Sequence, residues 1–295
     1  MIQRTRGEKI FNVFNYIILT LFAFTTLYPF LYTLSISLST KAEAESIGLH
    51  ILPNFQKITI DPYKMVFKNA EIWNAYKYTL FRTIVGTVLS LLVTCFYGYA
   101  LSRPRLPMKR FFVIFIMFTM LFSGGQIPTY LNIKSLGLIN NIWVYVLPML
   151  ISAYNVIVSR SFFASLPESL NESAKIDGAG EFRIFFQIIV PLSKPIIMTL
   201  ALWNAVAHWN EWFSGMMYIT DSRKIVVQNY IQRIVNEGNT NLVSDVNASA
   251  ADQIEVTGKT IQSASIIVSI LPILLFYPFV QKYFVKGVTL GAVKG

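Results

Sequence analysis

Three kinds of residue are scarce in this sequence, and each shortage excludes a class of protein. Cys95 is the only cysteine, so the chain can form no internal disulfide. His50 and His208 are the only histidines and no HExxH pattern is present, which argues against a metal site built by this chain alone. Charged residues make up 14% of the chain, compared with about 25% in soluble domains. With 54% hydrophobic residues, the composition indicates an integral membrane protein.

Signals for nucleotide, nucleic-acid or ion chemistry are also missing. Gly258-Lys259-Thr260 resembles the end of a phosphate-binding P-loop, but Gln253 occupies the position of the first glycine, so this chain should not bind ATP. The net charge of +10 is scattered over the ends of apolar runs rather than gathered in one stripe, so we expect no nucleic-acid partner.

Long apolar stretches are what the sequence has in abundance. A helix that crosses a bilayer needs about 20 mostly apolar residues. We therefore expect an all-α membrane protein with one transmembrane domain over 1–295 and six spans, at about 11–36, 81–102, 111–131, 140–162, 195–217 and 261–281. The first stretch precedes an AEA tripeptide at 42–44, as a signal peptide would. At about 30 residues it is longer than a signal core of about 7–15, so we expect an uncleaved span.

The distribution of Lys and Arg predicts the orientation. Short segments rich in these residues, such as the one with Arg103, Arg105, Lys109 and Arg110, should face the cytoplasm. The long loops, by contrast, hold most of the acidic residues. We therefore expect both termini and the polar segment 164–194 in the cytoplasm, and the loop 218–259 on the outer side.

The most elaborate polar segment, residues 172–195, reads ESAKIDGAGEFRIFFQIIVPLSKP. Upstream of it, Ser165-Leu166-Pro167-Glu168 has the spacing of a capping box and predicts a helix that runs to about Asp177. This helix should have a packing side and a charged side. The packing side comprises Leu170, Ala174 and Asp177 beside Ser173, and the charged side comprises Glu168, Asn171, Glu172 and Lys175.

A second short helix should follow after the chain reverses. Gly178 can adopt a positive φ without the penalty that a Cβ carries, which would end the first helix. From Glu181 onward, apolar residues recur at i, i+3, i+4 and i+7 and predict one buried stripe of Phe182, Phe185, Phe186 and Ile189. Pro191 and Pro195 should end this helix before the fifth span. By itself, the pattern also fits a polar connection without further function.

These residues resemble those of a known family. The pattern E-S-A-x-x-D-G-A at 172–179, followed by I-x-x-P-L at 188–192, resembles the EAA loop of ABC importer permeases. The six expected spans, the long outer loop and the ending at 287–295 are similar to MalG-like carbohydrate permeases. Gly124-Gly125 with Ile127-Pro128-Thr129-Tyr130, and also His208-Trp209-Asn210, resemble the branch that handles complex oligosaccharides.

The resemblance implies the type I ABC importer permease fold and a conduit for an oligosaccharide, not an enzyme. The implied partners are a second, different permease subunit in a heterodimer, two cytoplasmic ATPase subunits and an extracytoplasmic binding protein, all at a bacterial plasma membrane. ATP and Mg would be bound by the ATPase subunits, and no cofactor by this chain.

The resemblance also implies which residues contact the ATPase subunits. In the loop these are Glu172, Ser173, Ala174, Asp177, Gly178, Ala179 and Pro191, and in the C-terminal tail they are Gly291, Lys294 and Gly295. Ser173 departs from the alanine that is usual in the family, which exchanges one small residue for another and should keep a close approach possible.

The outer loop contains an amphipathic segment near 223–236. Its apolar residues recur at helical spacing and are Val227, Tyr230, Ile231 and Ile234. From periodicity alone, this helix either covers the outer mouth of the bundle or contacts a partner. The resemblance favours contact with the binding protein, through Gln228, Tyr230 and Arg233.

The fifth apolar stretch carries polar residues. Asn204, His208 and Glu211 recur at i, i+4 and i+7, so a continuous helix would place them on one side, with Trp212 next to His208. Two interpretations stay open. These residues either line the outward part of a translocation pathway or brace its gate, or they form an interfacial anchor whose polar groups are satisfied.

Other functions stay open at this point. An ABC permease for a solute other than a sugar would have the same pattern. An ion-coupled secondary transporter should carry carboxylates inside its spans, and Glu211 near the end of one span is the only candidate. An assembly or signalling protein could use the cytoplasmic loop as a docking site without transporting anything.

Overall fold

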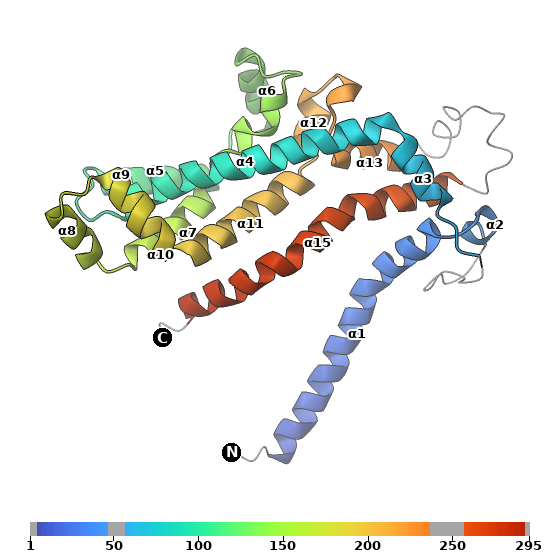
Figure 1. The fold of residues 1–295 in the computed structure, drawn as a ribbon, viewed down its shortest axis with the longest axis horizontal. Helices are drawn as coiled ribbons and strands as arrows, with labels where there is room; N and C mark the ends of the chain where they lie inside the picture. Colours follow the sequence, from blue (N-terminus) through green and yellow to red (C-terminus); the bar gives the residue numbers. More distant parts are fainter. Residues whose placement is uncertain (1–4, 47–56, 237–256, 293–295) are drawn as a thin grey trace. The chain divides into compact units, whose positions relative to one another are not determined.

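Every element in the described part of the structure is a helix, which confirms the predicted all-α class (Figure 1). The computed structural model describes residues 5–46, 57–236 and 257–292, and these residues contain no strand. The chain divides into two compact units, one of residues 1–72 and 231–271 and the other of residues 73–230 and 272–295.

The first unit includes a long apolar helix, α1 (Arg6–Ser37), which begins at a capping box. Thr5 Oγ1 accepts a hydrogen bond from the Glu8 amide at 3.3 Å, and the Glu8 carboxylate accepts one from the Thr5 amide at 2.8 Å. The other elements with residues in this unit are α2 (Lys41–Ala44), α3 (Asp61–Lys68) and parts of α4 (Ala70–Ser102), α13 (Val227–Asn236) and α15 (Gly258–Ala292). The Lys259 ammonium donates to the Ala44 carbonyl at 3.0 Å, which ties α15 to α2.

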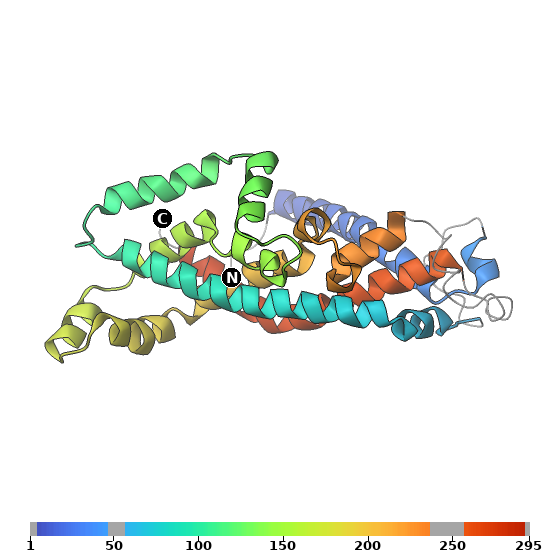
Figure 2. The same ribbon diagram turned by 90° about the horizontal axis from the view of Figure 1, so that it is seen from above.

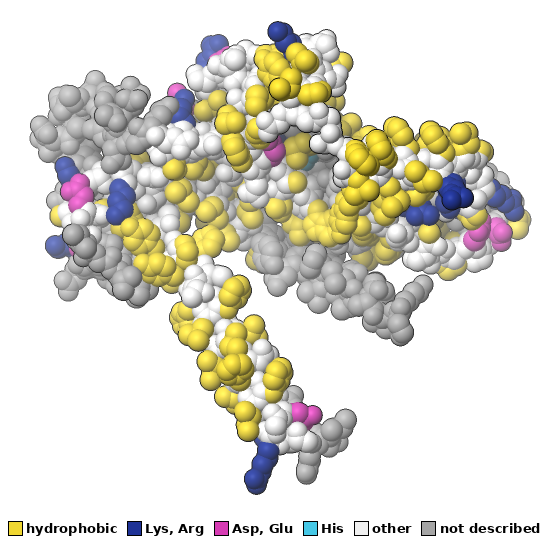
Figure 3. Space-filling model, turned by 180° about the vertical axis from the view of Figure 1, so that it is seen from behind, with side chains coloured by type: hydrophobic (Ala, Val, Ile, Leu, Met, Phe, Trp, Pro, Cys, Tyr) yellow, Lys and Arg dark blue, Asp and Glu magenta, His cyan; other side chains and the backbone are white. Residues whose placement is uncertain are grey.

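Helix α1 is apolar on all sides. Its large side chains, from Ile10 to Leu34, are mostly exposed, and none of its most apolar window is buried within the chain. Figure 3 shows hydrophobic side chains over the visible face of this helix. A helix that is hydrophobic all round is typical of a segment that lies in lipid or against another membrane helix.

The second unit contains the remaining elements. They are α5 (Lys109–Leu121), α6 (Gln126–Ser135), the 3₁₀ turns η1 (Ile142–Tyr145) and η2 (Leu147–Met149), α7 (Ala153–Ala164), α8 (Ser169–Ile176), α9 (Glu181–Ile184), the π-helix η3 (Phe185–Ile189), α10 (Val190–Leu192), α11 (Lys194–Asn210), α12 (Phe213–Tyr218) and η4 (Ser222–Lys224). Most of α4 also belongs to this unit.

Several helices are long and apolar enough to cross a membrane. Among the described residues these are α1, α4 and the Gly258–Leu275 part of α15, and the number rises to six if three bent pairs each count as one span. The bends are 113° between α5 and α6, 49° between η1–η2 and α7, and 85° between α9–α10 and α11. The six predicted crossings and their boundaries stay a prediction.

A glycine breaks the expected third span. Helix α5 ends at Leu121, and Gly125, just before α6, has a φ of +85°, in the left-handed region that favours glycine. The 13 residues of α5 reach about 20 Å, less than the roughly 30 Å of a hydrocarbon core. Figure 2 shows α6 turning away from the direction of α5. Hydropathy cannot detect this break because the residues on both sides of it are apolar.

Two glycines let α4 approach its neighbours in the second unit. A Cβ built at Gly86 would lie 2.6 Å from the His208 ring of α11, and one built at Gly98 would lie 2.0 Å from Ser159 Oγ of α7. Small residues at contacts between helices allow close packing inside membranes. Helices α4, α7 and α11 therefore pack closely together.

A hydrophobic cluster surrounds the end of α4 near Ser102. It contains Cys95, which is 5% exposed, together with Tyr99, Phe163, Phe185 and Ile189. The Tyr99 ring lies 5.1 Å from the Phe185 ring and 6.2 Å from the Phe163 ring, between centroids. The cluster joins α4 to α7 and to the segment that follows α8.

Candidate functional site

The loop between α7 and α11 begins differently from the prediction. Ser165 closes α7, and its hydroxyl donates to the Phe162 carbonyl at 2.7 Å. Helix α8 begins at Ser169, with Glu168 at its N-cap and no side-chain cap. The predicted capping box at Ser165 is therefore wrong, because these residues end one helix instead of beginning the next. The predicted end of α8 near Asp177, its C-cap, is confirmed.

Helix α8 presents a polar side to the surroundings. Glu172, Ser173 and Asp177 are exposed, whereas Ala174 is buried. Two assignments in the prediction are wrong: Asp177 is not on the packing side, and Asn171 is buried instead of lying on the charged side. Asn171 is polar and buried because it contacts a tyrosine of α4.

One apolar residue shares the exposed side of α8, which we define as Glu172, Ser173, Ile176 and Asp177. Ile176 is 86% exposed. Sequence reasoning missed it, although its position four residues after Glu172 places both on one side of the helix. The Ile176 side chain is therefore accessible to a partner, although one exposed apolar residue does not by itself mark an interaction site.

A Schellman motif ends α8. Gly178 has a φ of +78°, which confirms the predicted positive φ. The Ala179 amide donates to the Ala174 carbonyl at 2.9 Å, and the Gly178 amide donates to the Lys175 carbonyl at 3.0 Å. The motif satisfies carbonyls at the helix end and reverses the chain toward α9.

The second half of the loop does not form the single stripe that was predicted. Phe185 and Ile189 are buried, but Phe182 is 73% exposed and Phe186 is also exposed. The reason is the π-helix over Phe185–Ile189, whose wider turns shift the spacing on which the prediction relied. Pro191 lies in α10, which ends at Leu192, so the predicted helix end before the fifth apolar stretch is confirmed.

Tyr99 of α4 joins both halves of the loop. Its hydroxyl lies 3.1 Å from the Glu181 carboxylate of α9 and 3.3 Å from Asn171 Oδ1 of α8. The Lys175 ammonium forms an ion pair with Glu181 at 2.6 Å. These hydrogen bonds, with that of Lys175 first, hold the pKa of Glu181 below its ordinary value of 4.5. The carboxylate is therefore charged at neutral pH and accepts from both α4 and α8.

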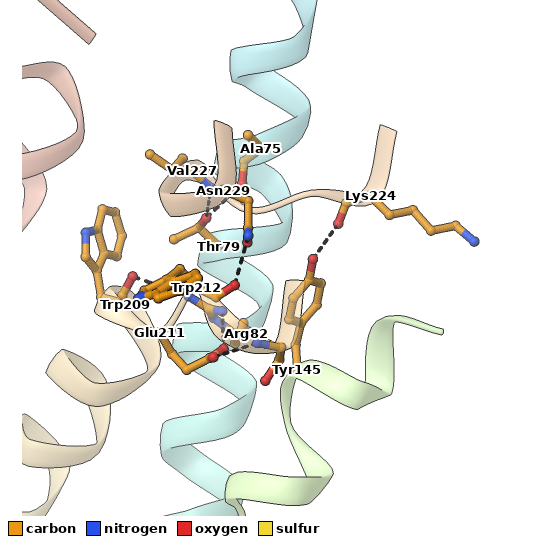
Figure 4. Close-up of polar contacts among 11 residues, drawn as sticks. Ala75, Thr79, Arg82, Tyr145, Trp209, Glu211, Trp212, Lys224, Val227 and Asn229 are labelled. Carbon is orange, nitrogen blue, oxygen red and sulfur yellow. Dashed lines mark hydrogen bonds and ion pairs between the residues drawn. The ribbon is translucent and has the colours of Figure 1, made fainter. Parts of the chain in front are cut away.

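A buried ion pair lies at the far end of α11 (Figure 4). The Arg82 side chain of α4 is 0% exposed, and its Nη1 lies 2.9 Å from Glu211 Oε2. Arg82 Nη2 donates to the Trp209 carbonyl at 3.3 Å, and the guanidinium lies over the Tyr145 ring, 5.3 Å from its centroid. The arginine of α4 thus contacts both the end of α11 and η1 with one side chain.

The prediction assumed that Glu211 continues α11, and this assumption is wrong. The helix ends at Asn210, and Glu211 has the extended backbone of a C-cap, with φ −69° and ψ 127°. Its Oε1 accepts from the Ser214 amide at 2.7 Å, near the start of α12. The prediction that Trp212 follows His208 on one helix face is therefore wrong, because the chain leaves the helix between them.

The structure also places the other two polar residues of α11. Asn204 and His208 are buried, and Asn204 Oδ1 accepts from the Asn155 amide of α7 at 3.2 Å. Asn204 Nδ2 and His208 Nδ1 have no hydrogen-bond partner among the described residues. Both side chains face neighbouring helices of the same chain.

Hydrogen bonds around the ion pair hold the segment that follows α12 (Figure 4). The Tyr145 hydroxyl donates to the Lys224 carbonyl at 3.0 Å. Thr79 Oγ1 of α4 accepts from the Val227 amide at the start of α13, at 2.9 Å, and this contact is buried. Asn229 Nδ2 donates to the Trp212 carbonyl at 2.8 Å. The start of α13 is thereby attached to α4 and to the start of α12.

The apolar face predicted for α13 is confirmed, although the helix begins at Val227 and not near 223. Val227, Tyr230 and Ile234 are buried. Tyr230, expected to contact a partner, is only 2% exposed. Gln228 is half-buried, and Arg233 forms an ion pair with Glu71.

The C-terminal residues are described only in part. Gly291 belongs to α15, which continues to Ala292, whereas Lys294 and Gly295 lie outside the described residues. Within the described residues, no group of three or more His, Cys, Asp or Glu side chains could hold a metal ion.

Sequence reasoning missed Arg82 and Tyr99. Arg82 borders the apolar stretch that follows it, so the pattern marks it only as a boundary, and Glu211 is 129 residues away along the chain. A usable signal existed, because an arginine beside an apolar run needs a counter-charge and Glu211 is the carboxylate of the fifth stretch. No sequence signal marks Tyr99 among the other aromatic residues.

Comparisons with known proteins agree with this arrangement. Residues 111–290 match the family described as "Binding-protein-dependent transport system inner membrane component". The chain is 38% identical to Protein LplC of Bacillus subtilis (strain 168), over 99% of this chain and 98% of the relative. It is 37% identical to the Polygalacturonan/rhamnogalacturonan transport system permease protein YtcP of the same organism, over 98% of this chain and 99% of the relative.

A solved structure is similar as well. A chain of a bacterial ABC transporter involved in the import of the acidic polysaccharide alginate is 34% identical, with a TM-score of 0.88 over 96% of this chain and 100% of that chain. The predicted fold, that of a type I ABC importer permease, is confirmed.

We expect single substitutions in the Arg82–Glu211 pair to destabilise the protein more than the double substitution does. Arg82→Met or Glu211→Met alone should lower the free energy of unfolding by about 3–5 kcal/mol, because each leaves a buried charge without its partner. The double variant should regain most of that loss. Thermal denaturation of the purified protein measures both effects. Asp221→Asn, which removes the exposed pair with Arg223, is the control and should change stability little. A double variant as unstable as the single ones would contradict this account.

Proposed function

The chain belongs to the family of binding-protein-dependent transport system inner membrane components, and from that premise we propose that it is a permease subunit of an ATP-driven ABC importer for an oligosaccharide. It would form the conduit with a second permease subunit, most simply a different chain. Two cytoplasmic ATPase subunits would hydrolyse ATP, and an extracytoplasmic binding protein would deliver the sugar. The chain is not an enzyme in this proposal, and ATP and Mg belong to the ATPase subunits.

The observation that carries the proposal is the exposed side of α8. Glu172 offers a carboxylate that a basic group of an ATPase subunit could pair with, and charge-assisted hydrogen bonds are the stronger ones. Ser173 is small and Ile176 is apolar, so a partner could approach closely and bury surface. Asp177 adds a second carboxylate at the end of this side.

The other residues implied in coupling would shape the loop. Ala174 packs α8 onto the chain, Gly178 and Ala179 form the reversal, and Pro191 lies where the loop turns toward α11. We place this loop and both termini in the cytoplasm, following the distribution of Lys and Arg. The tail with Gly291, Lys294 and Gly295 would reach between the ATPase subunits.

At the other end of the unit, α13 is proposed to contact the binding protein. Gln228 and the polar side of α13 are half-buried and thus partly accessible, and Arg233 could exchange its pairing with Glu71 for a contact with the partner. Tyr230 is buried, so we propose that it supports the helix from the apolar side instead of forming the contact surface.

For Asn204, His208 and Glu211 we propose bracing in preference to lining the pathway. Two of these side chains are buried against helices of this chain, and the third is paired with Arg82. A role in the pathway would require these contacts to open during transport. The contacts therefore favour a structural role between helices, in which Asn204 Oδ1 and Glu211 have partners while Asn204 Nδ2 and His208 Nδ1 have none among the described residues.

The oligosaccharide is proposed to carry uronic acid units. YtcP is named for polygalacturonan and rhamnogalacturonan, and the similar solved structure belongs to an alginate importer, so both names refer to acidic polysaccharides. A solute other than a sugar would fit the same fold. Ion-coupled transport is disfavoured, because the carboxylate of the fifth stretch, Glu211, already has a cationic partner.

Transport reconstituted in liposomes tests the function. With the partner permease, the ATPase subunits and the binding protein, ATP hydrolysis should rise when the binding protein carries trigalacturonate, and labelled sugar should accumulate inside. Arabinotriose is the neutral control, and calorimetric titration of the binding protein ranks the two. Stimulation by arabinotriose alone would reject the uronic acid assignment. No stimulation and no uptake with either sugar would count against the importer.

Charge reversal on α8 tests the coupling role. Glu172→Lys should reduce copurification of the ATPase subunits and coupled transport by tenfold or more. A loss of this size corresponds to the free energy of about one charge-assisted hydrogen bond. Glu168→Lys is the matched control, because it makes the same charge change one turn earlier and disturbs the helix dipole in the same way. Equal losses for both variants would show that only the helix start matters.

A glycine pair tests the reversal. A Cβ at Gly178 or at Gly180 would meet nothing within 4 Å, but only Gly178 has a positive φ. Gly178→Ala should therefore reduce ATPase docking through backbone strain of about 1–2 kcal/mol, and Gly178→Val should reduce it further. Gly180→Ala should leave docking near wild type. A pull-down of the ATPase subunits measures docking of the three variants, and equal docking of all of them would reject a role for the turn.

A further inference from the structure

Helix α4 runs without a break through most of the second unit. Its 33 residues contain no proline, whereas the α5–α6, η2–α7 and α10–α11 segments are each bent. From Thr79 to Tyr99 the helix rises about 30 Å, close to the thickness of a hydrocarbon core. One rigid element can therefore extend from one membrane surface to the other.

Near one end, α4 contacts the start of α13. Thr79 is fully buried, and its hydroxyl donates to the Ala75 carbonyl at 2.9 Å while it accepts from the Val227 amide at 2.9 Å (Figure 4). Three residues further along, Arg82 pairs with Glu211. The backbone at the start of the proposed binding-protein helix is thus attached to a side chain of α4.

Near the other end, α4 contacts both halves of the loop that is proposed to couple to the ATPase. The Tyr99 hydroxyl lies within hydrogen-bond distance of Glu181 and Asn171, on either side of the turn at Gly178. A hydroxyl has one hydrogen to donate, and a carboxylate can only accept, so the Tyr99 hydroxyl donates to Glu181. Asn171 can complete the joint by turning its amide nitrogen toward Tyr99, since amide orientations are exchangeable.

Between the two ends, α4 is held closely by its neighbours. Gly86 lies against His208 of α11, and Gly98 lies against Ser159 of α7. The Ser90 hydroxyl donates to the Met149 carbonyl at 3.4 Å. A helix packed this tightly moves together with its neighbours, because closely packed interiors transmit displacement.

We propose that α4 is a strut that links the two docking surfaces, with Thr79 and Tyr99 as the positioning residues at its ends. Arrival of the loaded binding protein at α13 shifts α4 through Thr79, and Tyr99 passes the shift to the loop that contacts the ATPase. The inference rests on the proposed function and adds to it a physical connection between the two partners.

Two isosteric changes test the strut in the reconstituted complex. Tyr99→Phe removes the hydroxyl and keeps the packed ring, and Thr79→Val removes the acceptor for Val227. The measurement is the ratio of ATP hydrolysis with and without binding protein loaded with trigalacturonate, or with arabinotriose if the titration selects the neutral sugar. Each variant should lower this ratio about fivefold or more, the size of a typical coupling between sites.

The chain offers matched controls on the same helix. Thr87→Val removes a buried hydroxyl that has no hydrogen-bond partner among the described residues, and Tyr97→Phe removes a hydroxyl two residues from Tyr99. Both controls should keep the wild-type ratio. Thermal denaturation and the affinity for the binding protein are measured for all four variants, so that loss of folding or of docking is separated from loss of coupling.

The double variant decides between a shared route and two local effects. If α4 connects the ends, Thr79→Val with Tyr99→Phe should lower the ratio no further than the stronger single variant, because one break already interrupts the connection. Multiplied losses in the double variant, a single variant with the wild-type ratio, or a Thr79→Val loss that is explained by weaker docking would each overturn the strut. A wild-type complex without any stimulation would instead reject the proposed function.

Discussion

Arg82 carries a charge with none of its side chain exposed, and the arrangement around it follows from that constraint. A buried guanidinium needs a counter-charge and acceptors within reach, since removing it from water costs several kcal/mol. Glu211 supplies the charge, and the Trp209 carbonyl supplies an acceptor that the last turn of α11 leaves without a helical partner. Helix α11 has to end at Asn210 for both to be available. Arg82 and its partner Glu211 therefore link the end of α11, the start of α12 and the Tyr145 ring.

The close contacts of α4 form a second constraint, which depends on what its residues lack. Gly86 and Gly98 leave room for His208 and Ser159, the Ser159 hydroxyl donates to the Thr94 carbonyl, and nearby the Asn155 amide donates to Asn204. In lipid, hydrophobic burial contributes little to helix association, so packing and such hydrogen bonds take a larger share. The interior of this unit accordingly includes buried polar residues such as Asn155 and His208, whereas Phe115 and Phe118 of α5 are exposed.

The sequence predicted local features well where one residue type has one physical consequence. Gly178 at a reversal, the apolar face of α13 and the helical class all follow from backbone freedom or periodicity. It failed where the outcome depends on distant partners or on altered helical spacing. The π-helix exposed Phe186, the contact with Tyr99 buried Asn171, and the pairing with Arg82 took Glu211 out of its assumed helix. Periodicity assumes an unbroken α-helix, and the bent segments in this unit violate that assumption.

Burial of the sole cysteine gives the chain a practical property. Cys95 lies in the cluster at the end of α4 with 5% of its surface exposed, so water-soluble thiol reagents have little access to it in the folded protein. Two cysteines introduced on exposed elements can therefore carry a pair of spin labels or fluorophores in an otherwise unaltered sequence. Distances between the membrane surfaces can then be followed spectroscopically without first replacing a core residue, a change that would disturb the packing next to Tyr99.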